Sequence, residues 1–513
     1  MLTKVKTVAL DGMKGELVEI ETDISNGLPY FSIIGMADTS VREATERVKR
    51  ALVNSGFDYP KGRITVNLSP AHIHKRGSHF DLGIAIGLLL SQNIISHSVE
   101  NILFMGELSL DGRIVPIKGA LPMIMSIIEK KDSDIEEIIL PKENCSESYL
   151  FTKNTKVKIY PAASLREVVS HLEGKRISVY KEQEYNRKDK FNLDYLDVLG
   201  HENVKEAIMI AVAGKHNLLM IGPPGTGKTM IAKRVTSILK PMTLAEQIET
   251  TKIYSYAGKL TKEKPIISER PFRHITLGTT QAALVGGGSY PMPGEVSLAH
   301  NGVLFIDEML EFPDKILENL RVPMEDKKVH IVRKGNSTVF QSDFLLIGAT
   351  NPCRCGFYGD DRRPCTCTQT EINQYRNRLS GALMDRIDMT IEVSAIDYKE
   401  IEGNTNFEYS SEKMLETILK ATKVQEDRYY DLSFDYNGDI ESKYIETFCK
   451  LDKTGKAFME SIYENKHISM RRYHKILKVA RTIADIKQKK NISIEDLSAS
   501  YHYTRFFSER SGN

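Results

Sequence analysis

One eight-residue stretch constrains the fold more than any other part of the chain. Residues 222–229 form a complete G-x-x-x-x-G-K-T pattern, made of Gly222, Pro223, Pro224, Gly225, Thr226, Gly227, Lys228 and Thr229. In such a loop backbone N–H groups surround a phosphate, the lysine reaches the β- and γ-phosphates, and the threonine hydroxyl binds Mg²⁺. The apolar run at 217–221 predicts a strand before the loop, and residues 230–235 predict a helix after it. The stretch therefore predicts the P-loop of an ATPase core.

Two other apolar runs end in polar side chains that suit ATP hydrolysis. Residues 303–306 predict a buried strand that leads into Asp307 and Glu308. After a P-loop, this pattern predicts a Walker B element, in which Asp307 holds Mg²⁺ and Glu308 polarises the attacking water. A second run, 344–350, leads to Asn351, which we expect to orient the same water. The alternative for the acids is a buried strand that ends in carboxylates by chance.

Two arginines in residues 375–388 are candidates for a role between subunits. In a ring ATPase, an arginine must reach the γ-phosphate held by the neighbouring subunit to neutralise the charge that develops during hydrolysis. We expect Arg386 to be this arginine finger, with Arg378 as the second choice. A structural or solvated arginine is the alternative for each.

Four of the six cysteines lie in one short segment. Cys353 and Cys355 form one C-x-C pair, and Cys365 and Cys367 form a second. Four thiolates can complete a tetrahedral structural Zn²⁺ site, and no ligand position is left open for catalysis. The C-x-C spacing is tighter than the usual C-x-x-C, so four free thiols of a reducing compartment are the alternative.

The composition limits which partners the protein can bind and where in the cell it is expected. The net charge of +2 shows no bulk basicity, so any nucleic-acid contact must come from local loops. The first candidate is Tyr290, in the glycine-rich segment 286–295, because its ring could stack on a base. The second is a predicted β-hairpin at 327–338, whose basic residues could follow phosphates unless it is an ordinary solvated edge. These basic residues are Lys327, Lys328, Arg333 and Lys334.

With 41% hydrophobic residues, no apolar run of membrane-spanning length and no signal-peptide pattern, we expect a cytoplasmic protein without membrane contact.

The chain of 513 residues is predicted to be an α/β protein of three domains, the last of which is helical. Residues 1–170 predict an α/β domain, 171–190 a charged linker, 191–400 the P-loop core with the cysteine segment 353–367, and 401–513 a helical domain. In the first domain, residues 107–119 and 140–144 resemble the proteolytic domain of Lon-type proteases. The serine and lysine of that family's catalytic dyad would fall at or near His79 and at Leu121. Because Ser78 and Lys118 lie out of register, we expect a retained fold without peptidase activity.

The longest resemblance involves residues 286–302, G-G-G-S-Y-P-M-P-G-E-V-S-L-A-H-N-G, which precede the two carboxylates. They are similar to the magnesium-chelatase-like branch of AAA+ ATPases, and together with the Lon-like domain they make the whole chain resemble the ComM/YifB family. This resemblance implies a homo-hexameric, ATP- and Mg²⁺-dependent helicase that acts on single-stranded or branched DNA. It implies branch migration during natural transformation or recombination, with competence or recombination proteins as possible partners. It also implies that Arg471, in a helix capped by Ser469, is the sensor-2 arginine of the helical lid.

Three other functions are compatible with the same motifs. A protein-remodelling chaperone or a chelatase-type motor would use ATP without DNA. An ATP-dependent protease would need a working Ser78–Lys118 dyad. A nucleotide-gated scaffold would bind forked DNA without displacing a strand. Stimulation of ATP turnover by a protein partner, peptide hydrolysis and strand displacement distinguish these functions.

Overall fold

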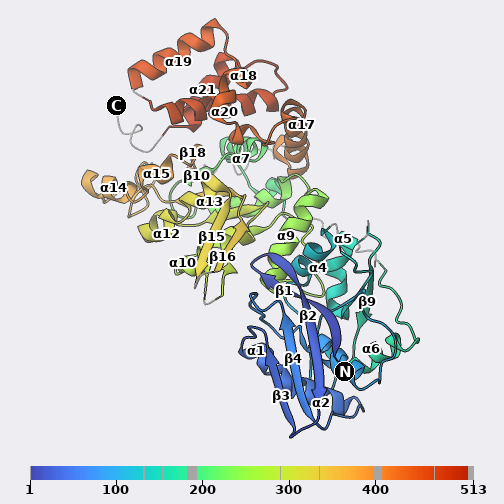
Figure 1. Cartoon of the computed structure of the whole chain (residues 1–513). Helices are drawn as coiled ribbons and strands as arrows, with labels where there is room; N and C mark the ends of the chain where they lie inside the picture. Colours follow the sequence, from blue (N-terminus) through green and yellow to red (C-terminus); the bar gives the residue numbers. More distant parts are fainter. Residues whose placement is uncertain are drawn as a thin grey trace.

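The computed structural model describes residues 2–130, 133–152, 155–181, 193–288, 290–333, 336–396, 407–466 and 468–505. An N-terminal α/β domain, a P-loop core and a C-terminal helical region follow one another along the molecule (Figure 1). This arrangement confirms the predicted α/β class. Within the described residues, no helix is long and apolar enough to cross a membrane.

The N-terminal domain is built on a seven-stranded mixed sheet in the order β3-β4-β2-β1-β5-β8-β9. Helix α3 packs closely on β1 and β2, because a Cβ at Gly83 would lie 2.6 Å from Ile20 Cδ1 and one at Gly87 would lie 2.5 Å from Thr22 Oγ1. The elements are β1 (Thr3–Asp11), β2 (Lys14–Ser25), β3 (Tyr30–Ile34), α1 (Thr39–Arg42), α2 (Ala44–Asn54), β4 (Arg63–Ser69), α3 (Asp81–Ser91), β5 (Ile102–Phe104), β6 (Glu107–Leu108), β7 (Ile114–Val115), α4 (Ala120–Ile128), β8 (Glu137–Pro141), α5 (Cys145–Thr152), β9 (Lys158–Ala162) and α6 (Leu165–Leu172).

The predicted linker begins too early at residue 171. Helix α6 continues to Leu172, and the next residues still pack on the N-terminal domain. The backbone N–H of Tyr180 donates to the carbonyl of Ile159 in β9 at 2.8 Å, and Ile177 packs against the hydrophobic core. These apolar side chains anchor a segment whose charge suggested a solvated linker. The rest of the predicted linker, from residue 182 on, lies outside the described residues.

The P-loop core contains a five-stranded parallel sheet in the order β11-β14-β17-β10-β18. Its three central strands, β14, β17 and β10, are nearly continuous apolar runs, as expected where helices cover both faces of a parallel sheet. Because all five strands run in the same direction, the residues that follow them meet at one edge. The elements of this region are α7 (Glu202–Gly214), β10 (Leu218–Ile221), α8 (Lys228–Lys233), α9 (Leu244–Tyr256), β11 (Phe272–Ile275), α10 (Gln281–Val285), β12 (Gly286–Gly287), β13 (Met292–Pro293), α11 (Glu295–Leu298), β14 (Val303–Ile306), α12 (Asp314–Glu318), α13 (Arg321–Asp326), β15 (Lys328–Arg333), β16 (Asn336–Gln341), β17 (Leu345–Thr350), α14 (Gln369–Arg376), α15 (Gly381–Met384) and β18 (Met389–Glu392).

The C-terminal region is helical, and its helices α17 and α20 pack against α7 of the core. Ser469 caps α20 by accepting a hydrogen bond from the backbone N–H of Arg472, as its position in the sequence predicts. The helices are α17 (Ser411–Tyr429), α18 (Ile445–Phe448), α19 (Lys453–Lys466), α20 (Met470–Ile486) and α21 (Ile494–Tyr503).

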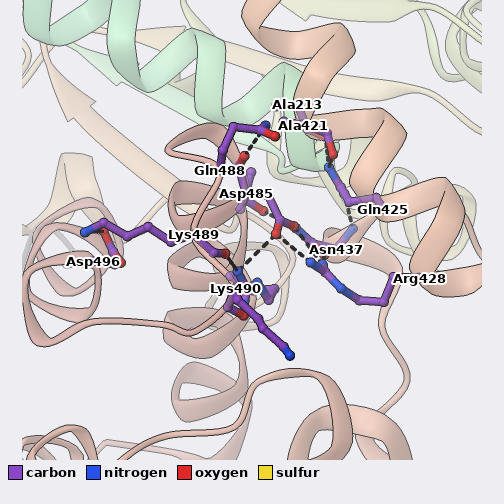
Figure 2. Close-up of polar contacts among 12 residues, drawn as sticks. Ala213, Ala421, Gln425, Arg428, Asn437, Asp485, Gln488, Lys489, Lys490 and Asp496 are labelled. Atoms are coloured by element: carbon purple, nitrogen blue, oxygen red, sulfur yellow. Dashed lines mark hydrogen bonds and ion pairs between the residues drawn. The ribbon is translucent and has the colours of Figure 1, made fainter.

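A buried ionic network holds the helical region together (Figure 2). The fully buried carboxylate of Asp485 in α20 accepts two hydrogen bonds from Arg428 of α17, at 2.7 and 2.6 Å. It also accepts a bond from Asn437 at 2.8 Å and pairs with Arg481 at 3.0 Å. Burial lowers the pKa of Arg428, but the hydrogen bonds to Asp485 outweigh it, so the pKa is raised overall. One carboxylate therefore compensates two guanidinium groups in the interior.

The same network reaches the P-loop core. Gln425 donates to the backbone carbonyl of Ala213 in α7 at 2.9 Å and accepts from the backbone N–H of Asn437 at 2.8 Å. Close by, His216 and the hydroxyl of Thr482 in α20 are hydrogen-bonded at 2.7 Å. Because α7 is followed directly by β10, these contacts connect the helical region to the strand that enters the P-loop.

Candidate nucleotide-binding site

The P-loop follows β10 with the backbone geometry that its glycines permit. Gly225 and Gly227 have φ values of +81° and +85°, in the left-handed region that favours glycine. Gly222 needs its missing side chain for a different reason: a Cβ there would lie 2.1 Å from the carbonyl oxygen of Val393. Helix α8 begins at Lys228, so its N-terminus faces the loop, where an anionic phosphate is favoured.

The Lys228 ammonium lies at the centre of this loop. Its Nζ donates to the carbonyls of Gly222 and Pro223 at 2.7 and 2.8 Å, and to Asn351 Oδ1 at 3.4 Å. Burial lowers the pKa of Lys228 to about 8, although the charges of Asp307 and Glu308 oppose this shift. A phosphate beside Nζ would stabilise the charged form, so the site favours an anionic ligand.

The Walker B carboxylates lie beside the P-loop, at the end of β14. Thr229 Oγ1 donates to Asp307 Oδ2 at 2.6 Å, which brings together a hydroxyl and a carboxylate, both suitable ligands for Mg²⁺. Glu308 is exposed and has a left-handed backbone with φ of +49°, and its N–H donates to Asp307 Oδ1 at 3.0 Å. The structure thus brings Lys228, Thr229, Asp307 and Asn351 together at one edge of the sheet, with Glu308 next to them.

The two candidate finger arginines differ in how strongly they are held. Arg386 is paired with Glu325 and donates to the carbonyl of Ala382 at 2.7 Å, so only 16% of its side chain is exposed. Arg378 lies 3.7 Å from a carboxylate oxygen of Glu311 and is 35% exposed. Arg386 must therefore release a closer partner before it can reach another subunit.

Asn217 ties the Arg386 segment to the strand that leads into the P-loop. Its Nδ2 donates to the backbone carbonyl of Arg386 at 2.9 Å, and its backbone N–H donates to Asp388 Oδ2 at 2.9 Å. Its Oδ1 accepts the N–H of Leu346 in β17 at 2.9 Å. Sequence reasoning did not single out this side chain, because a polar residue at the start of a strand carries no recognisable motif.

Arg471 occupies the first turn of α20 on its solvent-facing side. Its side chain is 63% exposed and lies 3.3 Å from Asp385. Arg472, one position further along, is buried and has its guanidinium over the ring of Tyr501 at 5.7 Å. Arg471 is thus the accessible arginine of the pair, and its sensor-2 role stays a prediction.

The four cysteines predicted to bind metal lie together. Their sulfur atoms are all within 4.8 Å of one another, and they form the one group of this kind among the described residues. The Sγ of Cys353 is 3.4 Å from that of Cys355 and 3.7 Å from that of Cys365. Tetrahedral Zn²⁺ with bonds of about 2.3 Å to sulfur requires sulfur atoms about 3.8 Å apart, so the cluster fits this ion.

The cysteine segment also contacts the P-loop, which the sequence did not suggest. It begins directly after Asn351 and passes close to Pro224, since a Cβ at Gly356 would lie 2.8 Å from Pro224 Cδ. From the other side, Arg376 donates to the carbonyl of Pro352 at 3.3 Å and lies over the ring of Tyr358 at 4.7 Å. A rearrangement of the cysteines would therefore be transmitted to the nucleotide site.

The predicted basic hairpin is present as β15 and β16, but Lys327 is not part of it. Lys327 ends helix α13 and pairs with Asp439 at 2.8 Å and with Asp343 at 3.5 Å. Lys327 has a left-handed backbone that ends the helix, so the strand begins one residue later. The two carboxylates neutralise the charge of Lys327. Lys328 is exposed on the outer face of β15. Arg333 is the last residue of β15, opposite Asn336 of β16, and Lys334 lies outside the described residues.

Tyr290, the ring expected to stack on a base, is half-exposed and has a partner that the sequence did not reveal. The guanidinium of Arg76, from the N-terminal domain, lies over its ring at 4.4 Å from the centroid. The carbonyl of the next residue, Pro291, accepts a hydrogen bond from the hydroxyl of Tyr256 at 3.2 Å.

The residues near the expected Lon-type dyad have other partners. The Ser78 hydroxyl donates to the carboxylate of Glu107, whereas the aliphatic chain of Lys118 lies against Gly258 of the P-loop core. His79 is buried against the carbonyl of Val8 at 2.7 Å, and burial lowers its pKa to about 4. No lysine–serine contact is present among these described side chains.

The parallel sheet, the P-loop and the Walker B edge define a P-loop ATPase core, and comparison with known proteins gives its class. Residues 194–401 match the family "Magnesium chelatase, subunit ChlI", residues 20–144 match "Subunit ChlI of Mg-chelatase", and residues 408–504 match "Magnesium chelatase, subunit ChlI C-terminal". The chain is therefore a magnesium-chelatase-like AAA+ protein, a class that uses ATP and Mg²⁺.

Similarity along the whole chain defines the family more narrowly. The chain is 38% identical over 501 residues to competence protein ComM of Haemophilus influenzae, covering 96% of this chain and 95% of that protein. It is 36% identical over 503 residues to the protein YifB of Salmonella typhimurium and 35% identical over 503 residues to YifB of Escherichia coli, covering 98% of this chain and 97% of each relative. The chain belongs to the ComM/YifB family.

Proposed function

We propose that the chain is an ATP-driven DNA helicase that works as a homo-hexameric ring in the cytoplasm and moves branched or single-stranded DNA during transformation or recombination. The observation that carries the proposal is the joint placement of Lys228, Thr229, Asp307 and Asn351 at one edge of the sheet. These groups suit phosphate binding, Mg²⁺ coordination and orientation of water, while exposed Glu308 would polarise the water.

A ring would complete this site with arginines from two directions. Arg386 or Arg378 of one subunit would approach the γ-phosphate bound by its neighbour, and Arg471 would approach it from the helical lid. The exposure of Arg471 and Arg378 supports this role. The hexamer itself is proposed from the family resemblance.

DNA as the substrate is supported by the printed name of one relative, a competence protein, and by local features of this chain. Tyr290 presents a half-exposed ring, and Lys328 presents an exposed charge on the hairpin. Aromatic rings and basic loops bind single strands independently of sequence.

We also propose that Cys353, Cys355, Cys365 and Cys367 hold a structural Zn²⁺. The sulfur separations fit tetrahedral coordination, and four protein ligands leave no position for a reacting water. The ion would fix the segment that packs on Pro224, so its role is to support the P-loop.

Two measurements on purified protein test the motor: ATP turnover with and without DNA, and strand displacement on forked and Holliday-type DNA. Lys228→Ala should abolish ATP binding, whereas Glu308→Gln should bind ATP and fail to hydrolyse it, and both should lose strand displacement. The exposed Glu412→Gln in α17 is a matched control for the second change. If DNA does not change ATP turnover and no strand is displaced, the proposed helicase function is refuted.

A chelatase-type or protein-remodelling motor is the second candidate, because the matched families are described as magnesium chelatase. It would show ATP turnover stimulated by a protein partner and not by DNA. An ATP-dependent protease is less well supported, since Ser78 bonds Glu107 and Lys118 packs elsewhere.

A further inference from the structure

The N-terminal domain lies against the part of the core that presents the proposed DNA contacts. Helix α4 packs on α9, as Figure 1 shows, and the N–H of Gly119 donates to the carbonyl of Ser255 at 2.9 Å. The turn between β1 and β2 approaches the basic hairpin, since a Cβ at Gly12 would lie 3.1 Å from the side chain of Thr338. Met13 of this turn packs into the hydrophobic core of the P-loop domain.

Arg76 is the residue of this domain that reaches Tyr290. The backbone is held on both sides of Arg76. Lys75 forms an isolated β-bridge with Ala37, and the N–H of Gly77 donates to Ser40 Oγ at 3.1 Å. Gly77 has a φ of +89°, so a turn that favours glycine follows the arginine directly. Arg76 is thus presented from a fixed loop.

Tyr290 is presented by the P-loop core. It lies in a short hairpin in which Gly286 and Gly287 of β12 pair with Pro293 and Met292 of β13. The Arg76 guanidinium covers one face of the ring at 4.4 Å, and half of the tyrosine surface stays exposed.

The chemistry of this pair suits a single nucleic-acid strand. An arginine that stacks on an aromatic ring keeps N–H donors at its edge, and these match the oxygens of a phosphate. In the part of the chain that the structure describes, no carboxylate forms a salt bridge with Arg76. A base that stacks on the exposed ring surface places its own phosphate within reach of such an edge.

We propose that Arg76 and Tyr290 together form one contact for single-stranded nucleic acid, in which a base stacks on Tyr290 and Arg76 binds the adjacent phosphate. This inference rests on the proposed function and gives the N-terminal domain a role in DNA binding. The N-terminal domain then forms part of the substrate path.

The chain contains no tryptophan, which allows a direct test. Tyr290→Trp introduces a single tryptophan at the contact, whose emission can be excited separately from that of the tyrosines. Oligo(dT) is added to the full chain with Mg²⁺ and a non-hydrolysable ATP analogue. Stacking should quench the emission. The matched control is an arginine–tyrosine pair within the N-terminal domain, Arg63 over Tyr30 at 5.9 Å. Tyr30→Trp should not be quenched.

Arg76→Ala in the Tyr290→Trp background tests the phosphate contact. Loss of one phosphate contact should reduce the log–log salt slope of binding by about 0.7, which corresponds to about a 5-fold weaker affinity at 0.1 M salt. Arg76→Lys should retain the salt slope, and Arg63→Ala should change neither quantity.

The anisotropy of a labelled oligonucleotide reports binding independently of these residues. If the oligonucleotide binds but the Tyr290→Trp emission is unchanged, or Arg76→Ala binds like Arg63→Ala, the inference is refuted and the proposed function stands. If no oligonucleotide binds, the DNA function itself is refuted. Tyr290→Phe should bind normally and Tyr290→Ala weakly, which shows by anisotropy alone that the ring is required.

Discussion

Replacing Asp485 by Asn should destabilise the helical lid more than replacing a charged residue on the surface of the same region. The substitution keeps the shape of the side chain and removes the negative charge that compensates Arg428 and Arg481. Asp485 is fully buried and Arg481 is only 3% exposed, so two cations remain without a counter-charge in the interior. Breaking a buried ion pair in this way costs about 3–5 kcal/mol.

The matched control is Asp427→Asn in helix α17. Asp427 pairs with Lys423 at 3.0 Å, but both side chains are 67% exposed. An exposed pair of this type on a helix contributes only about 0.3–0.5 kcal/mol. The two variants therefore make the same chemical change, on charge pairs that differ in burial.

Amide hydrogen exchange of α17 and α20 measures the free energy of opening of the lid without assuming that the whole chain unfolds in one step. Asp485→Asn should lower it by several kcal/mol, with a lower lid transition in scanning calorimetry. Equal protection in Asp485→Asn and Asp427→Asn would refute the view that the network in Figure 2 holds the helical region together.

Three further results are expected. Gly222→Ala should abolish ATP binding in a fluorescent-nucleotide titration, because its Cβ would lie 2.1 Å from the Val393 carbonyl oxygen; Gly381→Ala, where a Cβ meets nothing within 4 Å, should bind normally. The pKa of Lys228 is lowered to about 8, so above this pH the free site loses its charge and ATP must bind together with a proton. The ATP dissociation constant should therefore rise up to about tenfold per pH unit above pH 8, and a flat profile between pH 7 and 9.5 would contradict this. Cys355→Ser should reduce bound zinc measured by mass spectrometry and raise the KM for ATP, since the segment packs on Pro224; unchanged zinc would count against the cluster.

The nucleotide site was predictable because its residues follow strands of one parallel sheet. Lys228, Asp307 and Asn351 each come after an apolar run, and the carboxyl ends of parallel strands meet at one edge. Local pattern and fold therefore place these groups together. The grouping of the four cysteines was also predictable, because they lie close together in the sequence and a short loop can bring the two pairs into contact.

Contacts between distant segments were not predictable. Nothing in the local sequence of Lys327 shows that Asp439, more than a hundred residues later, neutralises its charge. The pairing of Arg76 with Tyr290 and the position of Gly356 against Pro224 depend equally on how separate elements pack. Periodicity and motifs describe neighbours along the chain, whereas these contacts are set by the tertiary fold.

Asn217 gives the proposed ring a consequence that reaches beyond one subunit. Hydrogen bonds of its side chain and backbone tie the strand that enters the P-loop to the segment that carries Arg386. In the proposed ring, this strand would belong to the subunit's own ATP site, whereas the Arg386 segment would point to the site of its neighbour. A shift of the P-loop on hydrolysis would thus move the arginine offered to the next site, and the partly buried Asn217 would couple hydrolysis at successive sites around the ring.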